Sequence, residues 1–559
     1  MEYLKLVKVY KKLEATTKRL EKTEIIANVL KEASAKEIAN LVYLIEGRVF
    51  PEWDERKIGF SDKLMIKAIA RASGENVKNV GILFNRKGDL GLVAEELLKK
   101  KKQATLVKKR FMTDNIIENI RKLAGLTGGG TVEKKIGIVT ELLTHTSPEG
   151  ANYIIKFTLE QLRIGIAEGI VRDAIARAFN KDVDDVERAF NLTVDYGKVA
   201  EAVKSGKLKV FDLTPGRPMK LMLAILVESI AEGFEALGKP MQLEFKLDGF
   251  RLQIHKKSNE IKLFTRRMED VTKQFPDAVE YVKNNVKGES FILDCEAVGV
   301  DKNTGKYRPF QEISQRIRRK YDIEEIIKKL PVELNIFDII YYNGKSLINE
   351  QLQERRNLLE KVIKENKKEI ILTKKIITSD EKEAKDFFKK ALASGVEGVM
   401  LKNLKSMYKP GRYVGGWCKL KSVLEPLDLV IVKAEYGEGK RAKMLSSYTV
   451  ACQNDEKLLE IGKVSTGVKE KAVGVTYDKM TKLLKPLITK EEGKGVVVRP
   501  KVVIEVGYEE IQKSPSYSSG YALRFPRVLL LREEKPIDEI SDIKTVEKIY
   551  KSQRGKKRR

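Results

Sequence analysis

The sequence predicts a multidomain protein with an all-α N-terminal domain, a central α+β domain with antiparallel sheets, and a small C-terminal β-barrel. The chain has 559 residues, which is too long for a single hydrophobic core. Helical spacing of apolar residues dominates the first part of the chain, and short strand-like runs dominate the rest. A cluster of proline and glycine separates the two patterns.

Residues 1–214 are expected to form the helical domain. Apolar residues recur at helical spacing near both ends of this region, at Leu6, Val9, Tyr10 and Leu13 and again at Ile166, Ile170 and Ala174. Gly128-Gly129-Gly130 interrupts the helices. The segment Thr214-Pro215-Gly216-Arg217-Pro218 ends the helical region and marks a domain boundary.

Residues 215–422 are expected to form the α+β domain. Strand-like runs follow one another here as LEFKL, RLQIH, IKLFT, FILDCEAVGV, VELNIFDIIYY and EGVMLK. Helical patterns at 350–366 and 380–394 lie among them. Strands and helices mixed in this way favour antiparallel sheets with packed helices.

Residues 423–540 show about five strand-like runs, including LDLVIVKAEY, SYTVAC and LLEIGKV. So many strands in so short a domain favour a barrel of the OB type. Residues 541–559 are expected to form a C-terminal helix and a basic tail ending in RGKKRR.

Charge and cysteine usage limit the classes of function. The net charge of +28 indicates a polyanionic partner or a highly solvated surface. Lys and Arg are spread along the chain rather than focused into a membrane anchor. The three cysteines form no CxxC pair, so a disulfide framework or a structural zinc site is not expected. The N-terminus is charged throughout and lacks the apolar core of a signal peptide. A cytoplasmic protein without a membrane partner is predicted.

The segment Lys246-Leu247-Asp248-Gly249-Phe250-Arg251 carries the first candidate for chemistry. The alternation of apolar and polar residues places Glu244 and Lys246 on one face of a strand. Asp248-Gly249 is expected to turn the chain so that Arg251 returns past the lysine on the next strand. Burial and a neighbouring positive charge would lower the pKa of such a lysine and make it a nucleophile toward an α-phosphate. Taken alone, the short motif is better explained by a solvated hairpin without a catalytic role.

Further blocks follow in order, and with them the chain resembles the ATP-dependent DNA ligases, most closely their archaeal branch. The residues that carry the resemblance are KLDGFR at 246–251, TRRMEDVT at 265–272, LDCE at 293–296, Phe337-Asp338, EGVMLK at 397–402, WCKLK at 417–421 and LRFPR at 523–527. The N-terminal region adds FPEWDER at 50–56, GDLG at 88–91 and LRIGIAEG at 162–169. The resemblance therefore covers nearly the whole chain.

The resemblance implies a role for each block. Lys246 would be the adenylated nucleophile, with Glu244 beside the adenine and Phe337 stacked on it. Arg251 and Glu296 would hold the ribose, and Arg266 would contact phosphate or ribose. The remaining cofactor-binding positions, assigned to phosphate, are Lys402, Arg412, Lys419 and Lys421. In the last domain, Arg524 and Arg527 would orient the pyrophosphate.

The resemblance also implies the cofactors and the reaction. ATP would be the nucleotide, and Glu397 with Glu296 would bind Mg²⁺, with Mn²⁺ as an alternative. Lys246 would take AMP from ATP and pass it to the 5′-phosphate at a nick in duplex DNA, and the 3′-hydroxyl would then displace AMP. Such an enzyme acts in DNA replication, repair and recombination. Alternatives are an RNA ligase, an mRNA-capping-type nucleotidyltransferase and a non-enzymatic DNA-binding scaffold.

Contacts with DNA are expected from the helical domain. Candidates are Lys99, Lys100, Lys101, Lys102, Gly128, Gly130, Thr131 and Arg163. A sliding clamp is a further candidate partner, although Gln103-Ala104-Thr105-Leu106 lacks the aromatic pair of the usual clamp motif. The protein is expected to act as a monomer.

Two departures from the family pattern concern the expected pocket. Cys295 replaces a glycine and would add a side chain beside a catalytic carboxylate. Tyr413 stands where many archaeal relatives have an arginine, so the phosphate contact is assigned to the adjacent Arg412.

Overall fold

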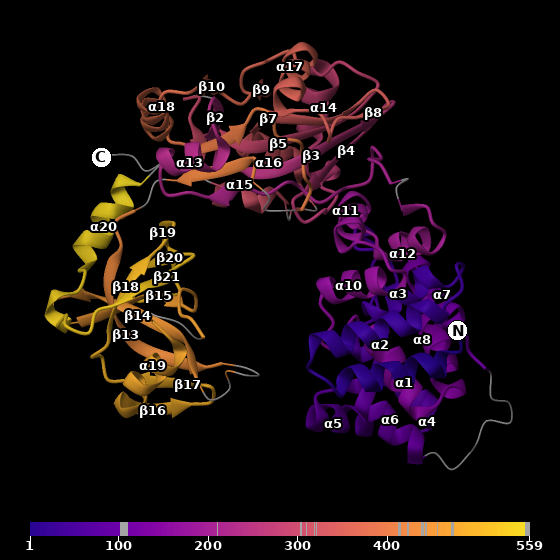
Figure 1. Ribbon diagram of the computed structural model, residues 1–559. Coiled ribbons are helices and arrows are strands. Elements are labelled where there is room, and N and C mark those ends of the chain that lie inside the picture. The colour runs from indigo at the N-terminus through magenta and orange to yellow at the C-terminus, as the bar shows by residue number, and fades with distance from the viewer. Residues whose placement is uncertain are drawn as a thin grey trace.

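The protein was examined as a computed structural model, in which a central α+β domain joins a helical lobe to a β-barrel lobe (Figure 1). The structure describes residues 1–100, 110–208, 211–301, 304–308, 310–317, 319, 321–411, 415–421, 424–437, 441, 444–455, 457–470 and 475–553. The predicted three-part architecture is confirmed. The predicted domain boundaries stay predictions, although the main hydrophobic cores are distributed along the chain as expected.

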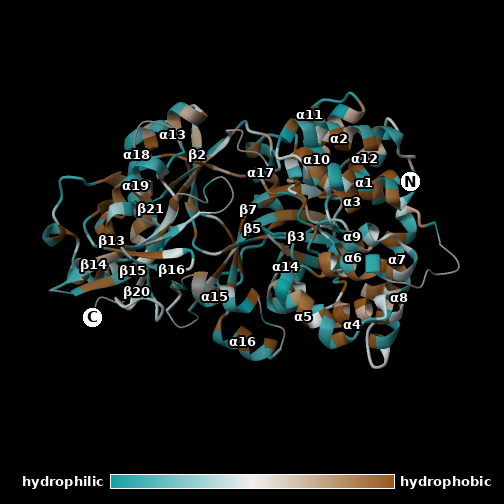
Figure 2. Cartoon of the chain, turned by 90° about the horizontal axis from the view of Figure 1, so that it is seen from below, coloured by the Kyte–Doolittle hydropathy of each residue, from teal (hydrophilic) through white to brown (hydrophobic). Residues whose placement is uncertain are grey.

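The helical lobe is built around one apolar core, which includes the predicted Leu6, Tyr10 and Leu13. Its helices in the described residues are α1 (Tyr3–Glu14), α2 (Arg19–Glu32), α3 (Ile38–Ile45), α4 (Asp62–Ser73), α5 (Val77–Lys87), α6 (Leu90–Lys100), α7 (Thr113–Gly125), α8 (Thr131–His145), α9 (Pro148–Thr158), α10 (Glu168–Ala178), α11 (Val183–Thr193) and α12 (Tyr196–Lys204). Hydrophobic and hydrophilic residues alternate along these helices (Figure 2), and the buried hydrophobic residues together form the shared core. This burial of one face stabilises helices too short to persist alone.

The central domain contains two sheets. The five-stranded sheet has the order β1 (Ile225–Leu226), β12 (Trp417–Lys421), β11 (Gly398–Asn403), β2 (Met241–Lys246) and β10 (Lys375–Thr378). The main path of the seven-stranded sheet is β4 (Glu260–Thr265), β3 (Phe250–Lys257), β5 (Ser290–Val300), β7 (Val332–Tyr342) and β8 (Lys345–Ser346), with β6 (Tyr307–Arg308) and β9 (Ile370–Leu372) paired at its sides. Its helices are α13 (Ile230–Leu237), α14 (Pro276–Asn285), α15 (Phe310–Ile317), α16 (Ile323–Lys329), α17 (Leu352–Val362) and α18 (Glu381–Ala393).

The prediction of a hairpin at Asp248-Gly249 is wrong. β2 and β3 belong to different sheets, so this turn carries the chain from one sheet to the other. The close packing of that crossing explains the glycine, because a Cβ at Gly249 would lie 2.3 Å from the carbonyl oxygen of Ala297. Arg251 therefore lies on a different sheet from Lys246, and both residues line the cavity between the sheets.

The C-terminal lobe is the predicted OB-type barrel. Its described strands are β13 (Leu427–Tyr436), β14 (Leu445–Asn454), β15 (Lys457–Val464), β16 (Ile488–Glu492), β17 (Gly495–Val498), β18 (Val503–Gly507), β19 (Glu510–Lys513), β20 (Tyr521–Arg524) and β21 (Arg527–Leu531), which exceed the expected five. β13 is the central strand of this sheet, since β14, β17 and β18 all pair with it. α19 (Tyr477–Leu484) and α20 (Ile543–Ser552) pack on the barrel core, so the C-terminal helix belongs to this lobe.

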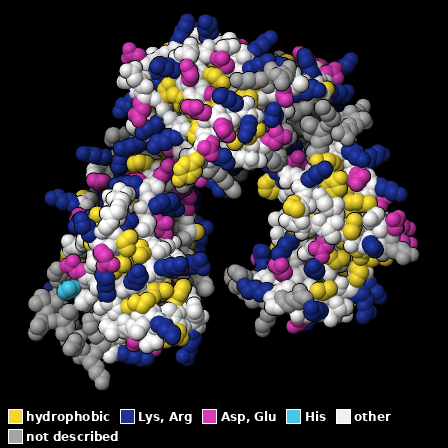
Figure 3. All heavy atoms as spheres, turned by 180° about the vertical axis from the view of Figure 1, so that it is seen from behind, with side chains coloured by type: hydrophobic (Ala, Val, Ile, Leu, Met, Phe, Trp, Pro, Cys, Tyr) yellow, Lys and Arg dark blue, Asp and Glu magenta, His cyan; other side chains and the backbone are white. Residues whose placement is uncertain are grey.

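Both lobes reach the central domain. Lys220 pairs with Glu52 at 3.0 Å, and the guanidinium of Arg217 lies 5.4 Å from the ring centre of Trp53. On the barrel side, Lys421 pairs with Glu509 at 3.2 Å. Open space separates the two lobes below the central domain, and Lys and Arg side chains are scattered over the visible surface (Figure 3).

Candidate active site

The candidate site is a cavity of about 1220 Å³ between the two sheets of the central domain. Residues from the helical lobe (Glu52, Asp54, Glu55 and Lys57) and from the barrel (Arg524) complete its lining. The cavity includes most of the residues proposed for nucleotide binding, namely Glu244, Lys246, Arg251, Arg266, Glu296, Phe337, Glu397, Lys402 and Lys419.

One face of the five-stranded sheet is polar and lines the site. Strand alternation and the pairing register bring Gln242, Glu244 and Lys246 of β2 next to Met400 and Lys402 of β11. β12 continues the same face with Trp417, Lys419 and Lys421. The opposite face carries the apolar residues of the domain core, among them Leu243, Phe245, Val399, Leu401 and Leu420. The predicted common face for Glu244 and Lys246 is confirmed.

Lys246 forms an ion pair with Glu397, whose Oε2 lies 2.6 Å from its Nζ. Glu397 immediately precedes β11, and its backbone N–H donates to the Lys246 carbonyl oxygen at 2.8 Å. The close approach of β11 to β12 needs the following glycine, because Gly398 has φ +151° and a Cβ there would lie 2.1 Å from the Leu420 oxygen. The nearest charge to the lysine is thus a carboxylate, where the sequence predicted Arg251.

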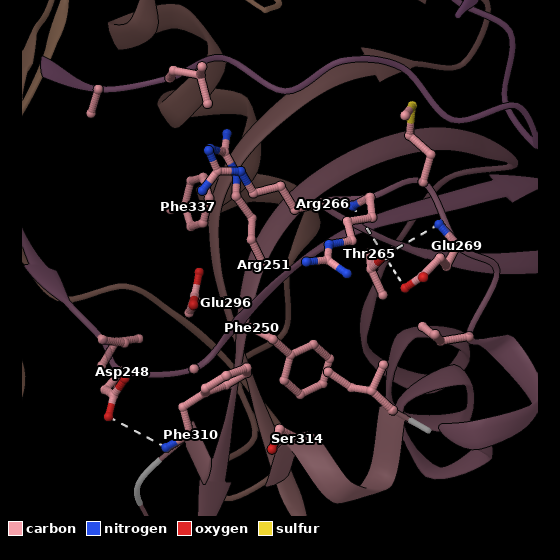
Figure 4. Close-up of a pocket in the computed structure, with 18 of the residues that line it drawn as sticks. Asp248, Phe250, Arg251, Thr265, Arg266, Glu269, Glu296, Phe310, Ser314 and Phe337 are labelled. Carbon is pink, nitrogen blue, oxygen red and sulfur yellow. Dashed lines mark hydrogen bonds between the residues drawn. The ribbon is translucent and has the colours of Figure 1, made fainter. Parts of the chain in front are cut away.

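Glu397 is the centre of a small charged cluster. Burial raises the pKa of its carboxyl, but Lys246 and Lys421 outweigh burial and bring that pKa to about 2. Asp248 is a neighbour that the sequence did not single out: burial, the charge of Glu397 and a hydrogen bond to it raise the Asp248 pKa to about 6. The backbone N–H of Phe310 also donates to Asp248 at 3.4 Å (Figure 4). Asp248 is part of the KxDG motif, but its hydrogen bond with Glu397 becomes visible only in the structure.

Arg251 and Glu296 project from the second sheet toward the cavity, close to Phe337 (Figure 4). Arg251 donates to both carboxylate oxygens of Asp294 at 2.8 and 2.6 Å, and Tyr408 donates to the same carboxylate at 2.7 Å. Burial raises the pKa of Glu296 to about 8, although Lys246 and Arg251 lower it. Asp294 was part of a quoted motif but received no role, and here it holds Arg251 in place.

Cys295 lies on the reverse side of this strand. It is fully buried in the apolar core with Leu252, Leu293 and Ile336, and burial raises the pKa of its thiol. The expectation that it adds a side chain next to the catalytic carboxylates is therefore wrong, because alternation points residue 295 away from residues 294 and 296.

The end of the cavity that is expected to hold the base is formed by Phe337, Trp417 and Lys402. The rings of Phe337 and Trp417 meet edge to face, with centroids 6.0 Å apart. The Lys402 ammonium lies 2.6 Å from Glu244 Oε2 and 4.3 Å from the centre of the Trp417 ring. The sequence assigned Lys402 to binding of the triphosphate. A carboxylate and two aromatic rings surround its ammonium here, which differs from the surroundings expected for a phosphate-binding lysine.

Further cations stand at the other end. Arg266 is exposed at the rim, and the Lys419 pKa is lowered by burial and by the charges of Lys421 and Lys246. Arg524 pairs with Glu510 at 3.3 Å and lies 5.9 Å from the Phe310 ring centre. Arg527 is exposed and does not line the cavity. Arg412 lies outside the described residues.

A metal ion has two carboxylates available here. Glu296 and Glu397 both line the cavity, but the described ranges contain no cluster of three or more acidic, histidine or cysteine side chains that could hold a metal. Two carboxylates suit Mg²⁺ that is also bound by phosphate oxygens and water. The residues therefore fit a metal that arrives with a nucleotide.

The expected DNA-binding residues lie in the helical lobe. Lys99 and Lys100 each pair with a glutamate one turn earlier on α6, both at 2.6 Å. Gly128, Gly130 and Arg163 are exposed, and the Thr131 hydroxyl donates to the Gly128 carbonyl at 2.8 Å. Lys101, Lys102 and the segment 103–106 lie outside the described residues. Within the described part, the helices lack the length and apolar run needed to span a bilayer.

Comparison with known proteins gives matches over nearly all of the chain. The family model described as "ATP dependent DNA ligase domain" matches residues 221–421, "DNA ligase N terminus" matches 2–176, and "ATP dependent DNA ligase C terminal region" matches 441–535. The DNA ligase of Nanoarchaeum equitans is 46% identical, with 99% of each chain covered. That of Methanopyrus kandleri is 42% identical, covering 98% of this chain and 99% of the relative. A solved structure titled "Pmar-Lig_Pre." shares the fold, with a TM-score of 0.55 and 17% identity over 95% of this chain and 99% of that chain.

Proposed function

The chain belongs to the ATP-dependent DNA ligase family, and on this premise we propose that it seals nicks in duplex DNA through AMP bound covalently to Lys246. The observation that carries the assignment is the position of Lys246. It ends a rigid strand and enters a cavity lined by Glu244, Phe337 and Arg524. A lysine amine in such a place can attack the α-phosphorus of ATP.

In the first step the Lys246 nitrogen forms a bond to the α-phosphorus, and the bond to pyrophosphate breaks. Before the attack the Lys246 ammonium must release a proton to solvent, so its ion pair with Glu397 belongs to the enzyme before it reacts with ATP. Glu244 and Phe337 orient the base, Arg251 and Glu296 the ribose, and Arg266, Lys419 and Lys421 the phosphates. Lining up these groups supplies much of the rate in an in-line displacement. Arg524 and Arg527 orient the leaving pyrophosphate, with Arg524 already at the cavity.

Glu296 and Glu397 would hold Mg²⁺ or Mn²⁺ together with the nucleotide phosphates. When bound, the ion would neutralise negative charge that develops on the phosphate oxygens. In the later steps AMP passes to the 5′-phosphate at the nick, and the 3′-hydroxyl displaces it to close the strand.

The open space between the two lobes is the proposed location of the DNA duplex. Gly128, Gly130, Thr131 and Arg163 would approach its backbone, whereas the lysines of α6 are already paired with glutamates. We also propose that the enzyme works as a monomer in the cytoplasm, on the chromosome, in replication, repair and recombination. Binding of a sliding clamp belongs to the same proposal.

The test begins with α-labelled ATP and Mg²⁺, followed by denaturation and a search for label on the polypeptide. The proposal expects acid-labile AMP on the polypeptide. This label should not form when the metal has first been removed with a chelator. It then expects sealing of a nicked DNA duplex in preference to a nicked RNA duplex. Preferential sealing of RNA, or labelling from GTP in place of ATP, would favour the RNA ligase or capping alternatives.

A further inference from the structure

The turn that carries Arg266 is partly buried by the helical lobe. This turn, at residues 265–270, follows β4 and brings Arg266 to the rim of the cavity (Figure 4). Met268 lies in the middle of the turn and is only 6% exposed. Its side chain belongs to the apolar core of the helical lobe, and among the described residues it is the only member of that core from beyond residue 214. The helical lobe therefore anchors the turn from outside the central domain.

A second contact from the helical lobe holds the far end of the same turn. The carboxylate of Glu55 accepts a hydrogen bond from the backbone N–H of Asp270. Glu55 and Met268 both line the cavity, so this junction between the two domains lies at the cavity wall. The helical lobe thus contacts the turn at two points, one on each side of its tip.

The turn needs such support because its tip has an unfavourable backbone conformation. Internal hydrogen bonds define its shape: the Met268 N–H donates to the Thr265 carbonyl at 2.8 Å, and the Thr265 N–H donates to the Glu269 carbonyl at 3.0 Å. Met268 nevertheless has φ +67°, in the left-handed region that side chains other than glycine rarely adopt. Such a conformation persists where the surrounding structure enforces it. Here the enforcing contact is the burial of the Met268 side chain in the helical lobe.

We infer that Met268 is a positioning residue for the adenylation of Lys246, because its burial in the helical lobe fixes the turn from which Arg266 reaches the nucleotide. This inference rests on the proposed function. Arg266 is exposed and has a long side chain with many rotamers, so the position of its backbone limits where its guanidinium can act. The helical lobe thus takes part in the first step, before any DNA is bound, in addition to its proposed contact with the duplex.

The test is a double-mutant cycle on self-labelling, measured with the full chain and without DNA. Met268→Ala should lower kcat/KM for ATP about 10-fold, and the loss should divide between kcat and KM as it does in Arg266→Ala. In the Arg266→Ala background the same substitution should cost less than about 2-fold, because the group that it positions is already absent. Met268→Leu, an apolar side chain of similar volume, should keep most of the activity.

Met65→Ala is the matched control. Met65 is fully buried in the same core, on α4. Its truncation should lower the melting temperature about as much as Met268→Ala does, while kcat/KM for ATP stays that of the wild type.

Glu55→Ala is a second variant that keeps the inference testable if Met268→Ala does not fold, because Glu55 is exposed. It removes the acceptor of the Asp270 N–H. The loss in kcat/KM should be about 3-fold, and it should again be seen only when Arg266 is present.

The inference is overturned if Met268→Ala causes the same loss with and without Arg266, or if Met65→Ala causes an equal loss, since either result would show a general effect on the fold. Wild-type self-labelling in both Met268→Ala and Glu55→Ala would also overturn it, as would wild-type self-labelling in Arg266→Ala. Failure of the wild type to label with ATP would instead contradict the proposed function.

Discussion

The two ends of the cavity are built differently. At the base end, Glu244, Lys402 and Trp417 are almost fully buried and come from neighbouring strands of one sheet. At the phosphate end, Lys246 and Glu397 are about one-fifth exposed, and the lining extends to residues of the helical lobe and of the barrel. Under the proposed function, the base would be recognised within one domain, whereas the end that holds the phosphates would be completed by residues from other domains.

This difference suits an enzyme with successive steps. A rigid base pocket can keep the nucleotide in place while the groups around the phosphate are exchanged. It also implies that substitutions at the two ends should have different kinetic effects. Those at the base end should change KM for the nucleotide, and those at the phosphate end should change the rates of individual steps.

The largest effect is expected from Lys246→Ala. Self-labelling should fall on the order of 10⁴-fold or more, because the proposed covalent bond to AMP forms at the Lys246 nitrogen. Lys246→Arg should be equally inactive, since a guanidinium does not lose its proton. Both variants should still close a nick that already carries AMP on its 5′-phosphate, measured by gel electrophoresis. Persistent label on either variant would place the nucleophile elsewhere.

Arg524→Ala should slow self-labelling more than it slows the sealing of a pre-adenylated nick. It removes a cation that the barrel contributes to the phosphate end, so the rate of self-labelling should fall about 100-fold. Sealing of a pre-adenylated nick should be much less affected, because no pyrophosphate leaves in that step. Single-turnover kinetics of both reactions would show the contrast. Arg499→Ala, an exposed arginine of the same lobe, is the matched control. Equal losses in both steps would argue against a role in orienting pyrophosphate.

Phe337→Leu should act through binding. Loss of an aromatic face against the base should raise KM for ATP about 10-fold, with little change in kcat for self-labelling. Leucine keeps the site apolar and limits repacking against Trp417. A fall in kcat with unchanged KM would contradict the division between the two ends.

Cys295→Ala should have the smallest effect on the chemistry. The thiol lies in the apolar core behind the site, so self-labelling should stay at the wild-type rate. Removal of a small buried group should lower the free energy of unfolding by about 1 kcal/mol, measured by denaturant titration. Impaired labelling in a stably folded variant would show that the reverse face of the strand matters to catalysis.

Local patterns in the sequence determined which residues of this protein share a face of a strand or helix, and which residues line the cavity. Period-two alternation predicted the common face of Glu244 and Lys246, and helical spacing predicted the buried residues Leu6, Tyr10 and Leu13 of α1. Ordered motif blocks identified most of the residues that line the cavity. These features were accessible because strand and helix periodicities depend on near neighbours in the chain.

Only the tertiary structure decided which side chains meet. Asp248-Gly249 crosses between sheets although its local sequence favours a hairpin, and the lysine therefore meets Glu397, some 150 residues later, in place of Arg251. Arg251 is paired with Asp294, and Lys402 lies at the base end although its motif suggested a phosphate ligand. The physical reason is that sheet order and register are set by burial of the apolar faces of distant strands, and no local spacing encodes those pairings.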